Sequence, residues 1–189
     1  PEEHGAWASV PEQSSPIEWL LAERMLIPAG WLASRQLFES IQPWDESLLI
    51  NQDGEYFTRA ILASNGVIFE PQSRLYYRSE MHGSVSQFKP HKAPSLFASV
   101  ESFEQAVLQL GNDSAIKTLI SNQYMGFIYR VYPLVPELQK KARAKIQQYG
   151  RPNRPNDLAE STLAKTICSI FGWKFLVQLR LLKQRMKSE

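Results

Sequence analysis

The sequence predicts an α/β fold that continues into a mainly helical C-terminal extension. Short apolar runs at residues 67–69 and 75–77 follow the turn dipeptide Asn65-Gly66 and are typical of strands. Residues 53–64, by contrast, carry apolar side chains on one face of a helix. Beyond about residue 92, apolar residues recur only at the helical spacings i, i+4 and i+7. This change in periodicity predicts a mixed first part and a helical second part.

The N-terminal part contains two predicted helices before the acidic turn. Residues 1–15 are polar and predict a loop, and a helix opens at Pro16, because proline in the first turn loses no hydrogen bond. An apolar stripe continues this helix until residues 28–30, Pro-Ala-Gly, break it. Residues 31–33 predict a short strand, and residues 35–41 predict a short helix with its apolar side chains inward.

Two apolar stripes, a basic helix and a tail make up the predicted helical part. The basic helix spans about residues 137–148, the proline-rich segment 151–156 is a linker, and helical periodicity resumes from Leu158. The stripes lie on two consecutive helices and consist of Leu96, Val100, Phe103, Val107 and Leu110, then Ile116, Ile120, Tyr124 and Ile128.

Composition and charge place the chain among ordinary globular proteins. Apolar residues make up 43% and charged residues 21% of its 189 residues, and the net charge is +2. A nucleic-acid-binding domain usually has a stronger basic bias, so we expect no nucleic-acid partner. The single cysteine, Cys168, excludes an intramolecular disulfide and a cysteine-rich zinc site. We interpret it as a small buried apolar side chain, which fits a reducing, cytoplasmic compartment.

The candidate catalytic residue is Asp53, which stands in the acidic turn Gln52-Asp53-Gly54-Glu55 at the start of a predicted helix. A carboxylate at a helix N-terminus is kept ionised by the terminal N–H groups and the helix dipole. An ionised carboxylate can accept a proton from a hydroxyl group while that oxygen attacks an electrophile. Aspartate is also a favoured N-cap residue, and capping alone explains the same position. Glu55 and Arg59, four residues apart on another face, predict a weak helix-stabilising pair.

Around this turn, residues 29–86 resemble the acceptor side of the inverting family-2 glycosyltransferases, which have the GT-A fold. In that family a Glu-Asp dipeptide at a helix start supplies the catalytic base, and an acidic residue often follows two positions later. Gln52, Asp53 and Glu55 match this pattern, with glutamine in place of the family's glutamate.

Two further turns carry the resemblance. The family has a Gly-Gly or Gly-Trp turn before a strand that lines the acceptor site, and Gly30-Trp31 matches it. The family also has a Gly-x-Phe-Asp-Glu turn upstream of the base. The segment 42–46, Gln-Pro-Trp-Asp-Glu, is similar to this turn, with Gln42 in the place of the glycine.

The resemblance implies transfer of a sugar from a nucleotide-sugar donor to a sugar or lipid-linked acceptor, with inversion at the anomeric carbon. It implies Asp53 as the catalytic general base, and Gly30, Trp31, Gln52 and Glu55 as acceptor-binding residues. It also implies a divalent metal cofactor, Mg²⁺ or Mn²⁺, that holds the donor diphosphate.

A polar loop after the predicted strand at residues 75–77 carries a candidate diphosphate site, formed by Arg78, His82, Ser84 and Ser86. Guanidinium and hydroxyl groups hydrogen-bond phosphate oxygens, and an imidazole can complete the coordination shell of a metal ion. The resemblance places this loop near the donor diphosphate, with His82 as the candidate metal ligand. A solvated loop explains the same composition, and both interpretations stay open.

The chain lacks the Asp-x-Asp metal motif that the donor-binding half of the family carries ahead of the matched segment. It begins at Pro1, with no signal peptide before the globular pattern. Either the chain has lost the activity or it is a C-terminal fragment of such an enzyme, and the start at Pro1 favours the fragment. We therefore expect a fragment that is inactive alone, with the metal held mainly by the absent half. The predicted organisation is an acceptor-side part at residues 1–90, a helical extension at residues 91–150 and a basic helical tail at residues 151–189.

The basic tail is the candidate surface for an alternative function, that of a non-catalytic helical interaction or membrane-docking module. Between Lys165 and Lys187 the sequence has six basic residues and no acidic residue. These charges exclude a membrane-spanning helix but suit peripheral contact at the inner face of an anionic membrane. A terminal helix packed on the domain, with a solvated basic face, explains the pattern slightly better. The tail has one apolar stripe of Phe175, Leu179, Leu182 and Met186, and a second of Trp173, Val177 and Leu181.

Overall fold

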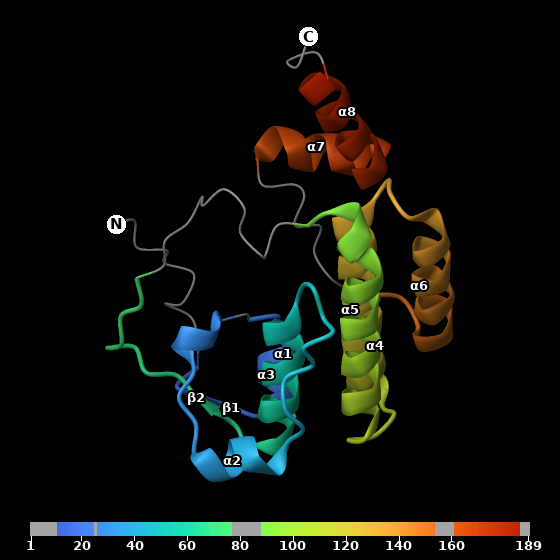
Figure 1. Ribbon diagram of the computed structural model, residues 1–189. Helices are drawn as coiled ribbons and strands as arrows, with labels where there is room; N and C mark the ends of the chain where they lie inside the picture. Colours follow the sequence, from blue (N-terminus) through green and yellow to red (C-terminus); the bar gives the residue numbers. More distant parts are fainter. Residues whose placement is uncertain (1–10, 25, 77–87, 154–160, 186–189) are drawn as a thin grey trace. The chain divides into compact units, whose positions relative to one another are not determined.

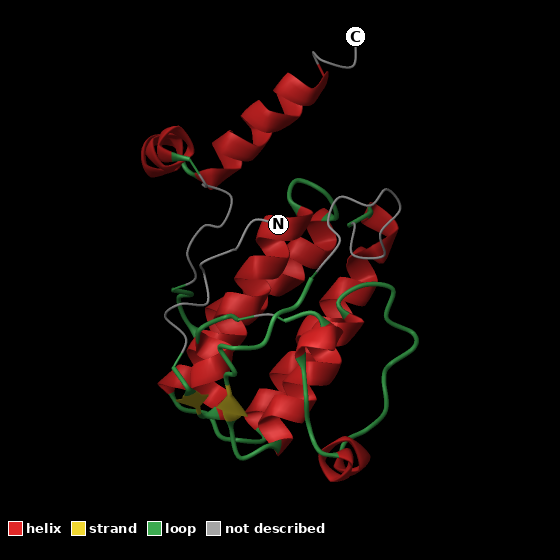
Figure 2. Ribbon diagram, turned by 90° about the vertical axis from the view of Figure 1, so that its left-hand side faces the viewer, coloured by secondary structure: helices red, strands yellow, loops and turns green. Residues whose placement is uncertain are grey.

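The computed structural model describes residues 11–24, 26–76, 88–153 and 161–185, and these residues are mainly helical (Figures 1 and 2). In chain order the α-helices are α1 (Pro16–Leu21), α2 (Arg35–Ser40), α3 (Gln52–Ala63), α4 (Ala93–Leu108), α5 (Ser114–Val131), α6 (Pro136–Tyr149), α7 (Thr162–Phe171) and α8 (Trp173–Arg185). The 3₁₀ turns are η2 (Pro28–Gly30) and η3 (Pro90–Lys92), and the strands are β1 (Gln13–Ser14) and β2 (Val67–Ile68).

The predicted α/β fold, the C-terminal part of a GT-A-like domain, is wrong. Within the described residues the sheet is a single antiparallel pair, β1 and β2, with Gln13 opposite Ile68. The predicted strand at residues 31–33 is a loop, and so are residues 75 and 76. The physical reason is exposure: Leu32 is 100% and Tyr76 82% exposed. These apolar runs have no core to cover, and a stable sheet needs a buried face.

The helices predicted from apolar stripes are confirmed. α4 buries Leu96, Val100, Phe103 and Val107, while Leu110 lies past the end of the helix and is 49% exposed. The stripe of α5 is buried along its full length. Helical periodicity over several turns is therefore a reliable signal in this chain, because each stripe has a core to face.

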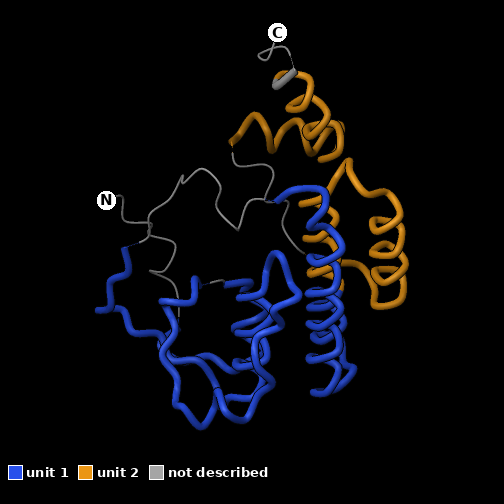
Figure 3. The backbone as a smooth tube through the Cα atoms, viewed as in Figure 1, with its two compact units in different colours: residues 1–120 blue, residues 121–189 orange. Residues whose placement is uncertain are grey.

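The chain divides into two compact units, residues 1–120 and residues 121–189 (Figure 3). The boundary falls inside α5, between Ile120 and Ser121. The predicted division into residues 1–90, 91–150 and 151–189 assigns a role to each segment. The two units are compact bodies and carry no information about roles, so that division stays a prediction.

In the first unit, α3 packs against α1, α2 and α4. α1 begins with a capping box, in which the Ser15 backbone N–H and hydroxyl donate to the Glu18 carboxylate and the Ser15 hydroxyl accepts from the Glu18 N–H. The hydrogen bond from the Ser15 backbone N–H lowers the pKa of Glu18 most, and the bond from the Ser15 hydroxyl lowers it further. The box starts the helix that places Trp19, 1% exposed, in the core.

In the second unit, buried polar side chains hold the turns in place. The Ser121 hydroxyl donates to the Gly150 carbonyl at 2.8 Å, and Asn122 exchanges two hydrogen bonds with Asn153. These hydrogen bonds hold the segment after α6, residues 150–153, against α5. The Gln139 amide, 4% exposed, donates to the Leu134 carbonyl at 2.6 Å and so fixes the turn between α5 and α6.

Val135, the N-cap of α6, has a left-handed backbone conformation, with φ 48° and ψ 60°. This conformation costs an L-residue about 1–2 kcal/mol, whereas asparagine adopts it readily. We therefore expect Val135→Asn to raise the free energy of unfolding by about 1 kcal/mol, measured by urea denaturation. Val135→Ala is the control, because alanine lacks the side-chain amide that lets asparagine adopt this conformation readily. Equal stability of the two variants would contradict the prediction.

Candidate functional site

Asp53 lies at the start of α3, as predicted, and is the second residue of the helix. Its side chain is half-buried, and its Oδ1 accepts a hydrogen bond from the Gly54 N–H at 2.9 Å. Gln52, the first residue of α3, is also half-buried. The residue before them, Asn51, has a left-handed conformation (φ 62°, ψ 22°) and makes no side-chain cap. Asp53 therefore supplies the carboxylate that interacts with the first turn of this helix.

Glu55 is buried, 6% exposed, and its carboxylate is fully engaged inside the protein. Arg59 Nε donates to Oε1 at 2.7 Å and Arg59 Nη2 donates to Oε2 at 2.9 Å. The Ser102 hydroxyl of α4 donates to the same Oε1 at 2.7 Å. The Arg59 guanidinium also donates to the carbonyl oxygens of Gln42 and Pro43. The predicted acceptor-binding glutamate is thus the centre of a network that joins α3, α4 and the loop before them.

Trp31 belongs to an aromatic cluster of the first unit. Its ring stacks on Phe57 with a centroid distance of 5.2 Å and meets the edge of Trp19 at 5.7 Å. Its indole N–H donates to the Leu26 carbonyl at 3.3 Å. Gly30 ends η2 and is exposed. The structure thus places Trp31 among packed rings, and aromatic pairs of this geometry stabilise a core beyond the area they bury.

Trp44, in the turn before α3, extends the same cluster. It stacks on Tyr56 with a centroid distance of 4.5 Å and an interplanar angle of 9°. Its ring is 39% exposed, and the Arg59 guanidinium lies over the Tyr56 ring at 5.3 Å. Arg59 therefore holds both the Glu55 carboxylate and the aromatic cluster.

The candidate diphosphate and metal residues Arg78, His82, Ser84 and Ser86 lie outside the described residues. Within the described ranges, no group of three or more His, Cys, Asp or Glu side chains could hold a metal ion. Sugar transfer from a nucleotide-sugar donor, and the Mg²⁺ or Mn²⁺ that it implies, stay predictions from the sequence.

A row of serines on α4 is a feature that the sequence analysis missed. The Ser95 hydroxyl accepts from the Leu49 N–H at 2.6 Å, and the Ser99 hydroxyl accepts from the Asn51 amide at 3.0 Å. Ser102 completes the row through its bond to Glu55. The spacing i, i+4, i+7 places all three on one face of a helix, and that spacing is a signal that a search of the sequence could have found.

Most of the large apolar side chains that are exposed in the described part of the second unit lie on α7 and α8, and we call them the α7–α8 surface. It consists of Leu163, Ile170, Phe171, Phe175, Leu179, Leu181 and Leu182, which are between 36% and 71% exposed. Gly172, with φ 79°, separates the two helices, and the Phe171 and Phe175 rings meet across it at 5.0 Å. Glycine suits the C-terminal end of α7, because it has no Cβ that would clash at this positive φ.

The same two helices also carry basic side chains. Lys165, Lys174, Arg180 and Lys183 are exposed on α7 and α8. No aspartate or glutamate occurs between residues 161 and 188. The α7–α8 surface therefore combines exposed apolar area with positive charge that no neighbouring carboxylate in the sequence offsets.

The opposite side of α8 is the one that packs on the unit. The Trp173 ring meets Tyr129 edge-on at 4.9 Å and Tyr132 at 5.0 Å. Leu176 is 5% exposed, and the Gln178 amide donates to the Tyr132 hydroxyl at 3.3 Å. Of the stripe predicted from the sequence, Phe175, Leu179 and Leu182 face outward, while Met186 lies outside the described residues.

No helix in the described part of the chain combines the length and the apolar character needed to cross a membrane. No protein-family profile, curated protein sequence or solved structure matches the chain. The resemblance to family-2 glycosyltransferases is therefore wrong on two counts: the fold is mainly helical, and no family match supports the short turns that carried it.

The Glu55 network gives a prediction about stability. Removing a buried carboxylate that pairs with a guanidinium leaves an uncompensated charge, so Glu55→Ala is expected to lower the free energy of unfolding by about 3 kcal/mol. Ser102→Ala should lower it by about 1 kcal/mol in the wild-type background and hardly at all in Glu55→Ala. Urea denaturation of the four proteins gives the coupling energy. Glu39→Gln, at an exposed position of α2, is the control. Additive effects of Glu55→Ala and Ser102→Ala would contradict the network.

Proposed function

We propose that the second unit is a non-catalytic docking module that binds anionic membrane surfaces peripherally through α7 and α8. The observation that carries the proposal is the α7–α8 surface, where exposed apolar side chains lie among basic ones with no acidic residue in the segment. An interfacial helix needs this combination, since the apolar face enters the boundary between head groups and acyl chains while the cations meet anionic head groups.

The charge distribution supports a membrane over a neutral apolar partner. Residues 161–185 contain five basic residues, more than the net charge of +2 of the whole chain. The rest of the chain is therefore net acidic, and the basic character is concentrated in α7 and α8. Each basic residue near an anionic leaflet contributes about 1 kcal/mol to binding, and this attraction is screened by salt within a Debye length.

The packing of α8 supports the same conclusion. Trp173 and Leu176 already hold the helix against the unit, so Phe175, Leu179 and Leu182 are not needed for that packing. Burying an exposed leucine or isoleucine side chain is worth about 2 kcal/mol. A few such side chains and four cations suffice for reversible binding without a spanning helix.

Vesicle co-sedimentation of the full chain tests the proposal. We expect binding to phosphatidylcholine vesicles that contain phosphatidylserine, weak binding to pure phosphatidylcholine, and loss of binding as salt rises. Ile170→Ser/Leu182→Ser should abolish pelleting, because both side chains are largely exposed and supply the insertion energy. Lys165→Gln/Lys183→Gln should weaken it roughly 30-fold, at about 1 kcal/mol for each lysine.

The matched control is Lys140→Gln/Lys141→Gln, which removes two exposed cations from α6 and should leave pelleting unchanged. Circular dichroism checks that each variant is folded. Equal pelleting with neutral and anionic vesicles, or none with either, would refute the proposal. So would a wild-type dimer in solution that Ile170→Ser/Leu182→Ser converts to a monomer, because the α7–α8 surface would then be a protein interface.

A further inference from the structure

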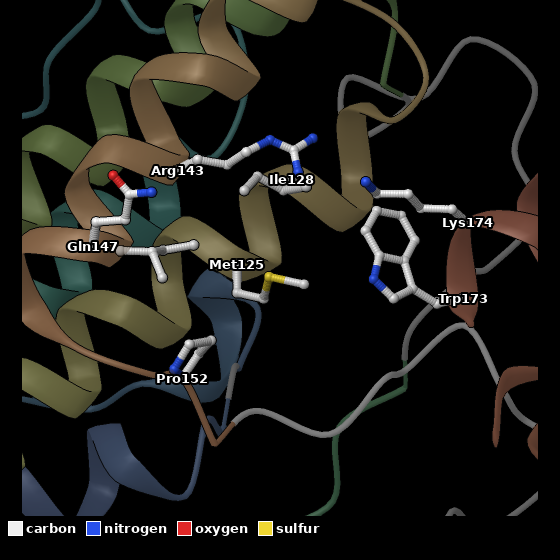
Figure 4. A pocket seen from close by; sticks show the side chains of 8 residues that line it. Met125, Ile128, Arg143, Gln147, Pro152, Trp173 and Lys174 are labelled. Atoms are coloured by element: carbon white, nitrogen blue, oxygen red, sulfur yellow. The ribbon is translucent and has the colours of Figure 1, made fainter. Parts of the chain in front are cut away.

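A pocket of about 400 Å³ lies within the second unit, between α5, α6, the segment after α6 and the start of α8 (Figure 4). Much of its wall is apolar. Met125 and Ile128 come from α5, Ile146 from α6, and the Trp173 ring from α8. The pocket is open to solvent, and its volume falls within the range of known small-molecule sites.

The remaining wall of the pocket is basic and polar. Figure 4 shows the Arg143 side chain from α6 and the Lys174 side chain from α8 extending toward each other over the pocket. Gln147 adds an amide, and none of the described residues that line the space is a carboxylate. Two cations that share a small volume repel each other, and an anion between them removes that repulsion.

Contacts inside the unit position both cations. Arg143 Nη2 donates to the Gln139 amide oxygen at 2.8 Å, and Gln139 is itself buried and bonded to the Leu134 carbonyl. A guanidinium has five N–H donors, so the bond to Gln139 uses one of them. The Lys174 ammonium lies 5.9 Å from the Trp173 ring centroid and 6.0 Å from that of Tyr132. The side of the pocket formed by Pro152 is fixed by the hydrogen bonds between Asn122 and Asn153.

We propose that this pocket binds the phosphate monoester head of a single anionic lipid. Arg143 would hold two phosphate oxygens through its planar guanidinium, and Lys174 would act as a point charge on the third. The start of the acyl chains would lie against Met125, Ile128 and the Trp173 ring. The inference rests on the proposed membrane docking, which would bring anionic lipid to the unit, and names the lipid chemistry that the docked unit recognises. Lys174 and Trp173 begin the helix that carries the α7–α8 surface, and the Trp173 wall of the pocket lies on the packed side of that helix.

Isothermal titration calorimetry with short-chain lipids, in the absence of vesicles, tests the pocket. The probes are dioctanoyl phosphatidic acid, dioctanoylglycerol and inorganic phosphate, applied to the full chain. We expect phosphatidic acid to bind about tenfold or more tightly than either of the others, because only it satisfies both the cations and the apolar wall. Inorganic phosphate or dioctanoylglycerol binding as tightly as phosphatidic acid would overturn the inference.

Three variants locate the binding. Arg143→Gln and Lys174→Gln should each weaken binding of phosphatidic acid about tenfold. Gln147→Trp, at an exposed position of α6, keeps both cations but fills the pocket, and should abolish binding. Lys140→Gln, which lies on α6 but does not line the pocket, is the matched control and should bind as the wild type does.

The outcomes separate this inference from the proposed docking. If Gln147→Trp binds phosphatidic acid as the wild type does, the pocket is not the site and the inference fails, while pelleting with anionic vesicles still measures docking. If Ile170→Ser/Leu182→Ser pellets normally but Arg143→Gln loses phosphatidic acid, docking through the α7–α8 surface fails and the pocket remains a lipid-phosphate site. Binding of phosphatidic acid that is weakened in Arg143→Gln and Lys174→Gln, lost in Gln147→Trp and unchanged in Lys140→Gln supports the inference.

Discussion

The first unit depends on one buried carboxylate, that of Glu55. Removing a carboxylate from water costs several kcal/mol unless a cation and further hydrogen bonds compensate it. Here Arg59 donates to both oxygens and Ser102 donates to one of them. Each partner comes from a different place: Arg59 from the next turn of α3, Ser102 from α4. The carboxylate is therefore satisfied only when α3 and α4 are packed in one register, and that register fixes the rest of the unit.

Several features of the first unit follow from this register. With α4 held against α3, Ser99 is in position to bind the Asn51 side chain, and Asn51 then cannot cap the helix that it precedes. Asp53 is left as the carboxylate of the first turn, which explains its position without any catalytic role. Arg59, held by Glu55, reaches the carbonyl oxygens of the preceding turn and lies over Tyr56, so the aromatic cluster and the ion pair stabilise each other.

The sequence predicts the helices whose apolar residues repeat over several turns. It does not predict features that depend on contacts between residues far apart in the chain. The stripes of α4 and α5 recur over several turns, so their burial is visible in the sequence. The predicted three-residue strands have no period, and the structure shows residues 31–33, and residues 75 and 76, as loop. The pairing of Glu55 with Arg59 is visible as a spacing of four, but it reads as a weak surface pair. Its burial is set by Ser102, 47 residues further along the chain, and no local pattern reports that contact.

The C-terminal helix is a second case in which the sequence alone does not decide the packing. Its sequence has two apolar strips on one helix, and either could have faced the protein. Trp173 decides between them, because its ring fits between Tyr129 and Tyr132 and so turns Phe175, Leu179 and Leu182 toward solvent. A helix that keeps one apolar side packed and the other exposed gains from any apolar surface that covers the second side. The same two helices carry exposed cations, so the proposed partner is an anionic surface, and one of these cations, Lys174, also lines the pocket. Lys174, at the start of α8, thus belongs both to the helix proposed to meet a membrane and to the pocket proposed to bind a lipid phosphate.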